Sequence, residues 1–246
     1  MYQFFVEPSQ IQGSRIVITG SDVNHIKNVL RMKIGEEIAV SNGIDDKEYR
    51  CGIEQFTDDE VICTLHFIRE EGVELPSKIY LFQSLPKADK MELIIQKAVE
   101  LGVYEIIPVS AARSIVRLDD KKAKNKISRW QGISEAAAKQ SKRGVIPEIK
   151  PIMSMKEAVD YASQFGVKLI PYELAQDMSK TKAIMDNISA GESVGIFIGP
   201  EGGFEEKEIT YAIEKGVVPI TLGKRILRTE TASLTVLSWL MYHFEE

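Results

Sequence analysis

The stretch 193-SVGIFIGPEGGFEEKE-208 decides the fold. It begins with a short apolar run typical of a buried strand, passes through Gly-Pro-Glu-Gly-Gly, and continues into an acidic segment typical of the first turn of a helix. A strand followed at once by a helix is the building unit of an α/β domain with a parallel sheet. Glycine lowers stability wherever another residue would fit, so the glycines at 199–203 indicate a backbone that must come close to something.

The same alternation of strands and helices extends outward from this stretch over residues 78–244. KIYLFQSL (78–85) is a predicted strand, and KADKMELIIQKAVELG (87–102) is an amphipathic helix closed by a glycine. VVPITLG (217–223) is the last predicted strand, and TETASLTVLSWLMYHF (229–244) is the last helix. The remaining predicted strands are 105–110 and 167–172, and the remaining predicted helices are 121–142, 155–166, 179–189 and 205–216. The sequence therefore predicts an α/β fold with a mostly parallel sheet.

The first seventy residues have a different pattern, of short strands and turns. Residues 48–68 alternate apolar and polar side chains like paired strands, and two further short strands, 14–20 and 36–43, end on glycine. Residues 22–32 place Val23, Ile26, Val29 and Leu30 on one helical face, before the segment 33–35 turns out of the helix. We therefore predict a small β-barrel with one helix, followed by a Gly- and Pro-containing linker at 69–78. The predicted domains are 1–71 and 72–246.

Composition narrows the cellular setting. The chain has 246 residues, of which 44% are hydrophobic and 27% are charged, and no apolar run approaches the ~18 residues of a membrane helix. The N-terminus has no signal-peptide pattern. Cys51 and Cys63 show neither CxxC spacing nor a nearby histidine cluster, which favours a reducing cytosol and argues against structural zinc. We therefore expect a cytoplasmic protein without a bound metal and without a membrane partner.

The charge is unevenly distributed. The whole chain carries −5, yet residues 110–150 hold eleven Lys and Arg against four Asp and Glu, a net +7. A local basic segment is the feature to which a phosphate backbone responds. A solvated helix face is an equal reading of the charge alone.

The chemistry is expected where three strands end, because ligands of open α/β sheets bind outside the carboxyl ends of the strands. The three segments are KLIPYE (168–173), IFIGPEGGF (196–204) and PITLGKRILRTETAS (219–233). The loop 199–203 is neither a Walker A loop nor a G-x-G-x-x-G fingerprint, so a phosphate cradle has little support. A loop that offers backbone groups to a heterocycle or an amino-acid tail fits better, and a tight turn without a ligand is the alternative.

The third segment also predicts the start of the last helix. Lys224, Arg225 and Arg228 place three cations in five residues. Thr229 or Thr231 is expected to cap the helix, and Glu230 falls in its first turn, where the helix dipole favours an anion. A capped helix behind a basic turn is, by itself, a structural feature.

At this point the chain resembles a known family. IGPEGGFEEKE (198–208) together with LGKRILRTETAS (222–233) is similar to the last two motifs of the RsmE-type 16S ribosomal RNA uridine-N3 methyltransferases of the SPOUT superfamily. HIKNVLRMKIGEEI (25–38) resembles the family's N-terminal PUA-like barrel. Segments 87–109 and 133–149 resemble its central motifs, so the resemblance covers the whole length.

The resemblance implies a C-terminal trefoil knot, at about 168–246, whose loops bind S-adenosylmethionine. It also implies methylation of N3 of a uridine in the decoding region of 16S rRNA within the small ribosomal subunit. The cofactor-binding residues that it implies are Pro171, Tyr172, Glu173, Gly199, Pro200, Glu201, Gly202, Gly203, Leu222, Gly223, Ile226, Leu227, Arg228 and Thr231.

Uridine N3 must lose its proton before it can attack the methyl group. Arg228 is the first candidate to stabilise the uracil anion, and Glu201 or Glu230 to accept the proton. A turn carboxylate and a helix N-terminal charge are the plain structural readings of these two glutamates. A base inside folded RNA must also be exposed, which calls for a basic surface that positions the strand. The predicted RNA-binding residues are Arg31, Lys33, Lys87, Arg113, Arg117, Lys139, Lys142 and Arg143.

The last helix is apolar on more than one face, so it packs in a core or against a partner. The resemblance points to a homodimer. Three rival functions stay open at this point: a SPOUT enzyme acting on a ribose 2′-hydroxyl or another base, a non-catalytic RNA-binding assembly factor, and a small-molecule enzyme that uses a nucleotide phosphate.

Overall fold

The computed structural model describes residues 1–70, 72–116 and 118–245. The chain divides into two compact units. The first unit comprises Met1–Glu74 and Ala138–Ile146, and the second comprises Leu75–Ala137 and Pro147–Glu246.

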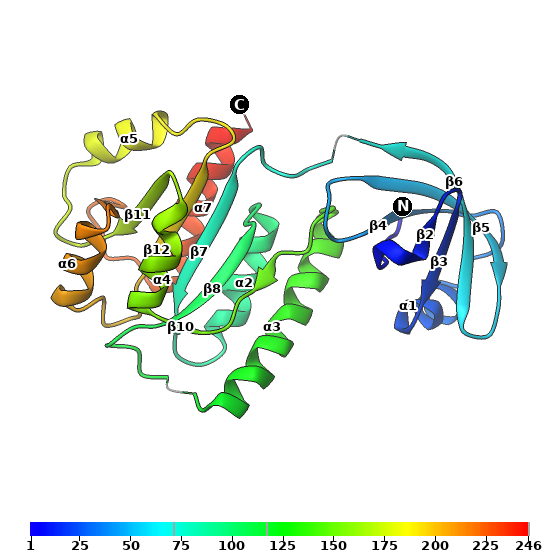
Figure 1. Cartoon of the computed structure of the whole chain (residues 1–246), viewed down its shortest axis with the longest axis horizontal. Coiled ribbons are helices and arrows are strands. Elements are labelled where there is room, and N and C mark those ends of the chain that lie inside the picture. Colours follow the sequence, from blue (N-terminus) through cyan, green and yellow to red (C-terminus); the bar gives the residue numbers. More distant parts are fainter. Residues whose placement is uncertain (71, 117, 246) are drawn as a thin grey trace. The chain divides into compact units, whose positions relative to one another are not determined.

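The first unit is built on a six-stranded, curled sheet with the strand order β1-β4-β5-β6-β3-β2 (Figure 1). Strands β1 and β4 are parallel, and the other neighbours are antiparallel. The strands are β1 (Gln3–Phe5), β2 (Ile11–Gln12), β3 (Arg15–Thr19), β4 (Glu37–Ser41), β5 (Glu48–Phe56) and β6 (Glu60–Arg69), with a short 3-10 helix η1 (Pro8–Gln10) before β2.

The core of this unit lies on one face of the sheet. Alternation along β3 buries Ile16 and Ile18, as the period of two in a strand requires. Cys51 and Cys63 are buried free thiols in the same core.

The predicted helix, which ends before Lys33, is a few residues longer than the observed one. The chain forms α1 (Ser21–Asn24) and then one π-helical stretch, η2 (His25–Val29). Arg31 has a φ of +54°, a left-handed conformation that ends the helix there. Val23 and Ile26 are buried as expected, but Val29 is exposed, because the π-helical stretch turns it out of the apolar face.

The second unit carries a seven-stranded sheet in which every neighbouring pair is parallel, which confirms the predicted α/β class (Figure 1). The strand order is β10-β8-β7-β12-β11-β13, with β9 also paired to β8. The strands are β7 (Lys78–Ser84), β8 (Glu105–Ser110), β9 (Glu148–Ile149), β10 (Met153–Ser154), β11 (Val167–Pro171), β12 (Ser193–Ile198) and β13 (Val218–Ile220).

Helices cover both faces of this sheet. Tyr80 and Phe82 of β7 share a buried cluster with residues of α4 and α6, and alternation directs Gln83 to the opposite face, where α7 lies. A parallel sheet covered on both sides needs strands with long apolar runs, as at 79–82 of β7 and 194–198 of β12. The helices are α2 (Lys90–Glu100), α3 (Asp120–Ser141), α4 (Met155–Tyr161) with the 3-10 turn η3 (Ala162–Gln164), α5 (Met178–Asp186), α6 (Glu206–Glu214) and α7 (Thr229–Phe244).

The strand order brings the three expected loops together. β11 precedes β12 and β13 in the chain, yet it lies between them in the sheet. The carboxyl ends of these three parallel strands therefore meet at one edge, and residues 171–173, 199–203 and 221–228 leave from that edge. The trefoil knot predicted for about 168–246 stays a prediction.

Candidate active site

A pocket of about 540 Å³ lies where β11, β12 and β13 end. It lies wholly in the second unit. The predicted cofactor-binding residues that line it are Pro171, Tyr172, Glu173, Gly199, Pro200, Glu201, Gly202, Gly203, Leu222, Gly223, Ile226, Leu227 and Arg228. The structure thus gathers three segments that are far apart in sequence around one cavity.

The pocket walls consist largely of backbone. Gly203 has a φ of +68° and Gly223 a φ of +108°, conformations that side-chain-bearing residues rarely adopt. The turn at 199–203 is closed by a hydrogen bond of 2.9 Å from the Gly203 N–H to the Pro200 carbonyl. The Arg113 guanidinium donates to the Gly202 carbonyl at 3.1 Å and joins the lining. A cavity of this size, with main-chain polar groups and apolar side chains, fits a nucleoside-sized ligand.

The start of α7 differs from the prediction. Arg228 occupies the N-cap position without a side-chain capping hydrogen bond, so the expected cap by Thr229 or Thr231 is wrong. The hydroxyl of Thr229 is used elsewhere, because it donates to the Gly199 carbonyl at 2.7 Å. Thr229 lines the pocket, whereas Thr231 is exposed and lies outside the lining.

The Gln83 side chain connects the end of β7 to the start of α7 by hydrogen bonds. It is fully buried, and its Nε2 donates to the Thr229 hydroxyl at 2.9 Å. Its Oε1 accepts from the Ser233 hydroxyl at 2.5 Å. A buried amide makes such contacts because an unsatisfied polar group would cost stability. The network links the ends of β7 and β12 to the start of α7. Sequence reasoning missed Gln83, although a glutamine inside the apolar run KIYLFQSL was a signal.

Lys90, the first residue of α2, connects the two candidate carboxylates. Its ammonium lies 3.3 Å from Glu201 Oε1 and 3.2 Å from Glu230 Oε2. The close contact with the Glu230 carboxylate is the main reason that the pKa of Lys90 lies above its usual value. No local pattern marks Lys90, since its partners lie more than a hundred residues away.

The same contacts act on Glu201. Burial by itself raises the pKa of this carboxyl. Hydrogen bonds from its own N–H, from the Lys87 N–H and from the Lys90 ammonium outweigh burial, so the pKa of Glu201 lies below its usual value. Glu201 is therefore a stable anion at neutral pH.

Arg228 is placed to act on a ligand, as are its neighbours Lys224 and Arg225 in the same lining. It lines the pocket and is exposed. Among residues 1–70, 72–116 and 118–245, no side chain forms an ion pair with its guanidinium. Ile226, on the same loop, is 93% exposed, so an apolar side chain at the pocket rim stands uncovered.

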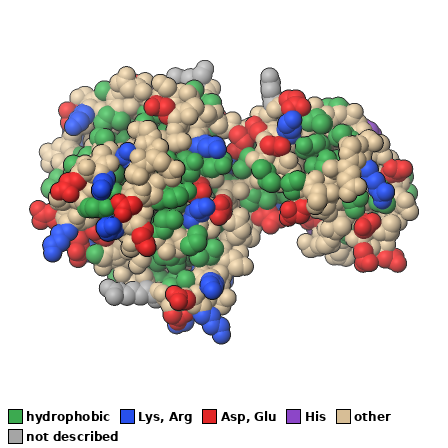
Figure 2. All heavy atoms as spheres, in the orientation of Figure 1, with side chains coloured by type: hydrophobic (Ala, Val, Ile, Leu, Met, Phe, Trp, Pro, Cys, Tyr) green, Lys and Arg blue, Asp and Glu red, His purple; other side chains and the backbone are tan. Residues whose placement is uncertain are grey.

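The predicted RNA-binding residues fall into three groups. Arg31, Lys33, Lys87, Arg113 and Lys142 are exposed. Lys139 and Arg143 are engaged within the fold: Lys139 pairs with Asp22 at 3.0 Å, and Arg143 is buried and pairs with Glu74. Arg117 lies outside the described residues. Figure 2 shows Lys and Arg interspersed with Asp and Glu on the visible face of the second unit.

None of the helices in the described part of the chain combines the length and apolarity that a membrane crossing requires. Within that same part, no group of three or more His, Cys, Asp or Glu side chains is arranged to hold a metal ion.

Comparison with known proteins gives two family matches. Residues 73–241 match the RNA methyltransferase domain, and residues 18–65 match the RNA methyltransferase PUA domain.

Individual relatives align over nearly the whole chain. The ribosomal RNA small subunit methyltransferase E of Bacillus subtilis is 39% identical, over 100% of this chain and 98% of its own length. The structure of the methyltransferase E of Neisseria gonorrhoeae bound to S-adenosyl methionine is 31% identical with a TM-score of 0.84, covering 98% of this chain and 97% of that one. A Legionella pneumophila putative methyltransferase with bound SAM is 33% identical with a TM-score of 0.84, covering 98% and 96%.

Proposed function

The chain belongs to the ribosomal RNA small subunit methyltransferase E family, and from this premise we propose that it methylates N3 of a uridine in the decoding region of 16S rRNA, using S-adenosylmethionine. The substrate is the RNA within the small ribosomal subunit, and the enzyme acts in the cytoplasm, where that subunit is assembled. The observation that carries the proposal is the pocket at the ends of β11, β12 and β13, with the free Arg228 guanidinium at its edge.

The residues present fit S-adenosylmethionine. The main-chain groups of 199–203 and 222–227 can bond the adenine edge, and the apolar Leu222, Ile226 and Leu227 can cover its faces. Bound adenine would cover the exposed Ile226 side chain and remove its apolar surface from water. The cofactor supplies an activated methyl group, so the protein mainly has to orient the uridine toward it.

Arg228 is proposed to stabilise the uracil anion. When N3 loses its proton, negative charge spreads onto the two flanking carbonyl oxygens, and a guanidinium can donate to one of them. Because Arg228 has no ion-pair partner in the described part of the chain, its charge is available to the substrate.

Glu201 and Glu230 remain the candidates to accept the N3 proton, directly or through water. Lys90 fixes the position of both carboxylates. The low pKa of Glu201 keeps its carboxyl ionised at neutral pH, as a proton acceptor must be. The same low pKa makes Glu201 a weaker base, so the contact with Lys90 favours the ionised form at the expense of basicity.

We further propose how the rest of the chain serves this reaction. Residues 1–71 form the RNA-binding domain and residues 72–246 the methyltransferase domain. The exposed Arg31, Lys33, Lys87, Arg113 and Lys142 contact phosphates and position the strand. A second copy of the chain covers α7, on which Tyr242 is 69% exposed.

The test is a methyl-transfer assay with labelled S-adenosylmethionine and small subunits that lack the modification, followed by digestion of the rRNA to nucleosides. We expect label in 3-methyluridine. Arg228→Ala should lower kcat by about 10²–10³-fold while cofactor affinity is kept, as for loss of one oxyanion donor. Arg228→Lys keeps the charge and should retain more of kcat. Label in a 2′-O-methyl nucleoside, or none in any RNA, would refute the proposal.

A further inference from the structure

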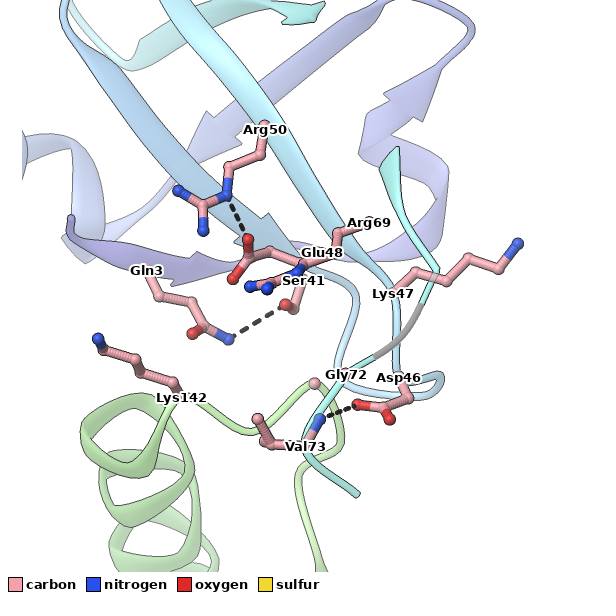
Figure 3. Close-up of a pocket in the computed structure, with 11 residues that line it drawn as sticks. Gln3, Ser41, Asp46, Lys47, Glu48, Arg50, Arg69, Gly72, Val73 and Lys142 are labelled. Atoms are coloured by element: carbon pink, nitrogen blue, oxygen red, sulfur yellow. Dashed lines mark hydrogen bonds and ion pairs between the residues drawn. The ribbon is translucent and has the colours of Figure 1, made fainter. Parts of the chain in front are cut away.

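A second pocket, of about 290 Å³, lies wholly within the first unit (Figure 3). Its walls come from β1, the ends of β4 and β6, the start of β5 and the segment after α3. This volume is at the lower end of the range for ligand pockets, about 300–1,000 Å³, so it suits a single small unit and not a large cofactor.

The pocket has an excess of positive charge. Four cations line it, Lys47, Arg50, Arg69 and Lys142, against the two acids Asp46 and Glu48. Figure 3 shows the Arg50, Arg69 and Lys142 side chains directed toward one side of the pocket, with the Gln3 amide near them, whereas Lys47 points away.

Both acids are already engaged. Glu48 accepts from Arg50, and Asp46 accepts from the N–H groups of Val73 and Glu74, each at 3.2 Å. Lys47 pairs with Glu70 at 3.0 Å. Within the described ranges, by contrast, Arg69 and Lys142 form no side-chain ion pair. Their charges are therefore open to an anion.

Gln3 adds an oriented acceptor. Its Nε2 donates to the Arg143 carbonyl at 2.8 Å and to the Ser41 hydroxyl at 3.1 Å, which fixes the amide because a carbonyl can only accept. Its Oε1 is buried and has no hydrogen-bond partner among the described residues. A buried acceptor without a partner is costly, and a ligand hydroxyl or amine would satisfy it.

The pocket is preformed by close backbone packing. A Cβ on Gly144 would lie 2.8 Å from the Asp45 carbonyl oxygen, so the chain after α3 touches the 45–46 loop directly. The buried pair of Arg143 with Glu74 holds this segment in place. The backbone then needs little reorganisation for binding, and only the side chains that cover Gln3 Oε1 have to move.

We infer that this pocket binds one nucleotide of the RNA substrate, with Arg69 and Lys142 contacting its phosphate and Gln3 Oε1 accepting from its ribose 2′-hydroxyl. The inference rests on the proposed function, which supplies RNA as the ligand. A nucleotide carries both a phosphate, which would pair with the cations, and a ribose hydroxyl, which would donate to the unsatisfied acceptor. The 2′-hydroxyl is the group that distinguishes RNA from DNA.

The experiment measures the Kd of a small-subunit rRNA fragment for the full chain at several salt concentrations. Arg69→Glu and Lys142→Glu should each weaken binding at least tenfold, and the slope of log Kd against log salt should fall by about 0.7 for each phosphate contact removed. Arg15→Glu makes the same charge change at an exposed position of β3 outside the pocket and should bind like wild type. Cofactor affinity should not change in any of the three.

A second comparison tests Gln3. Wild type should bind the RNA fragment more tightly than the same strand with 2′-deoxyribose, and Gln3→Leu should lose most of that preference. The preference is the ratio of the Kd for the deoxyribose strand to the Kd for the RNA strand, measured on the same variant. A modest loss of stability affects both Kd values alike and leaves this ratio unchanged. Arg69→Glu and Lys142→Glu variants that bind as tightly as Arg15→Glu would overturn the inference. Wild type that binds RNA but transfers no methyl group would instead overturn the proposed function.

Discussion

The hydroxyl of Thr229 donates a hydrogen bond of 2.7 Å to the carbonyl oxygen of Gly199. Thr229 begins α7, and Gly199 follows β12, so this one contact joins two walls of the proposed cofactor pocket. Because Arg228 directly precedes Thr229, the same bond fixes the backbone that carries the proposed catalytic cation.

We expect Thr229→Val to destabilise the protein by about 1–3 kcal/mol. Valine has nearly the shape of threonine but no hydroxyl, so the Gly199 carbonyl loses this donor and Gln83 Nε2 keeps only its bond to the Ser84 carbonyl. Thr229→Ser keeps the hydroxyl and should cost less. Urea unfolding of both variants makes the measurement, and equal stabilities would contradict this account of the network.

Glu201 should contribute stability that depends on pH. Its pKa in the folded protein lies below the usual 4.5, so the contribution is present above pH 4.5 and is lost as pH falls through the folded pKa. Glu201→Gln should therefore be less stable than wild type at pH 7, by up to about 1 kcal/mol for a partly exposed pair, and equal to it at strongly acidic pH.

The matched control is Glu173→Gln. Glu173 lines the same pocket, is exposed, and makes no side-chain hydrogen bond to any described residue. Its stability difference from wild type should stay near zero throughout. A pH-independent difference for Glu201→Gln would show that its pairing with Lys90 adds nothing.

Gly223→Ala should weaken cofactor binding without filling space. Gly223 has a φ of +108°, and the nearest atom to an added Cβ would be Met178 Cε at 3.8 Å, so the effect is backbone strain of about 1–3 kcal/mol. Gly132→Ala in α3, where nothing lies within 4 Å, should instead stabilise its helix by up to about 1 kcal/mol. Calorimetry with S-adenosylmethionine checks the first, and thermal unfolding checks both.

Tyr242→Glu should shift the proposed homodimer toward monomer, because it places a charge on the exposed part of α7. Ile213→Glu makes a similar change on the 46% exposed Ile213 of α6 and should leave the dimer intact. Sedimentation velocity over a range of concentrations distinguishes the two. Wild type that is monomeric at high concentration would refute the dimer.

Periodicity predicted the six helices and five of the seven strands described in the second unit, because strands of period two and helices of period 3.6 bury their faces in different ways, whereas the two-residue strands β9 and β10 are too short to show a period. The three pocket loops could be named in advance because they follow strands. Contacts between distant residues could not be predicted. Arg143 looked like a surface cation in a basic segment, yet Glu74 neutralises it inside the fold. The helix that begins at Asp22 was predicted a few residues too long, because periodicity carries no sign of the left-handed Arg31.

The central pair of the parallel sheet joins strands that are synthesised far apart, since Lys78 of β7 lies beside Ser193 of β12. Contacts of such long sequence separation make folding slow, because a long loop must close before any of them forms. The pocket is completed only when α7 docks on Gln83. A nascent chain therefore cannot complete this pocket until α7 has left the ribosome, so cofactor capture would follow the docking of α7 in an enzyme whose proposed substrate is ribosomal RNA.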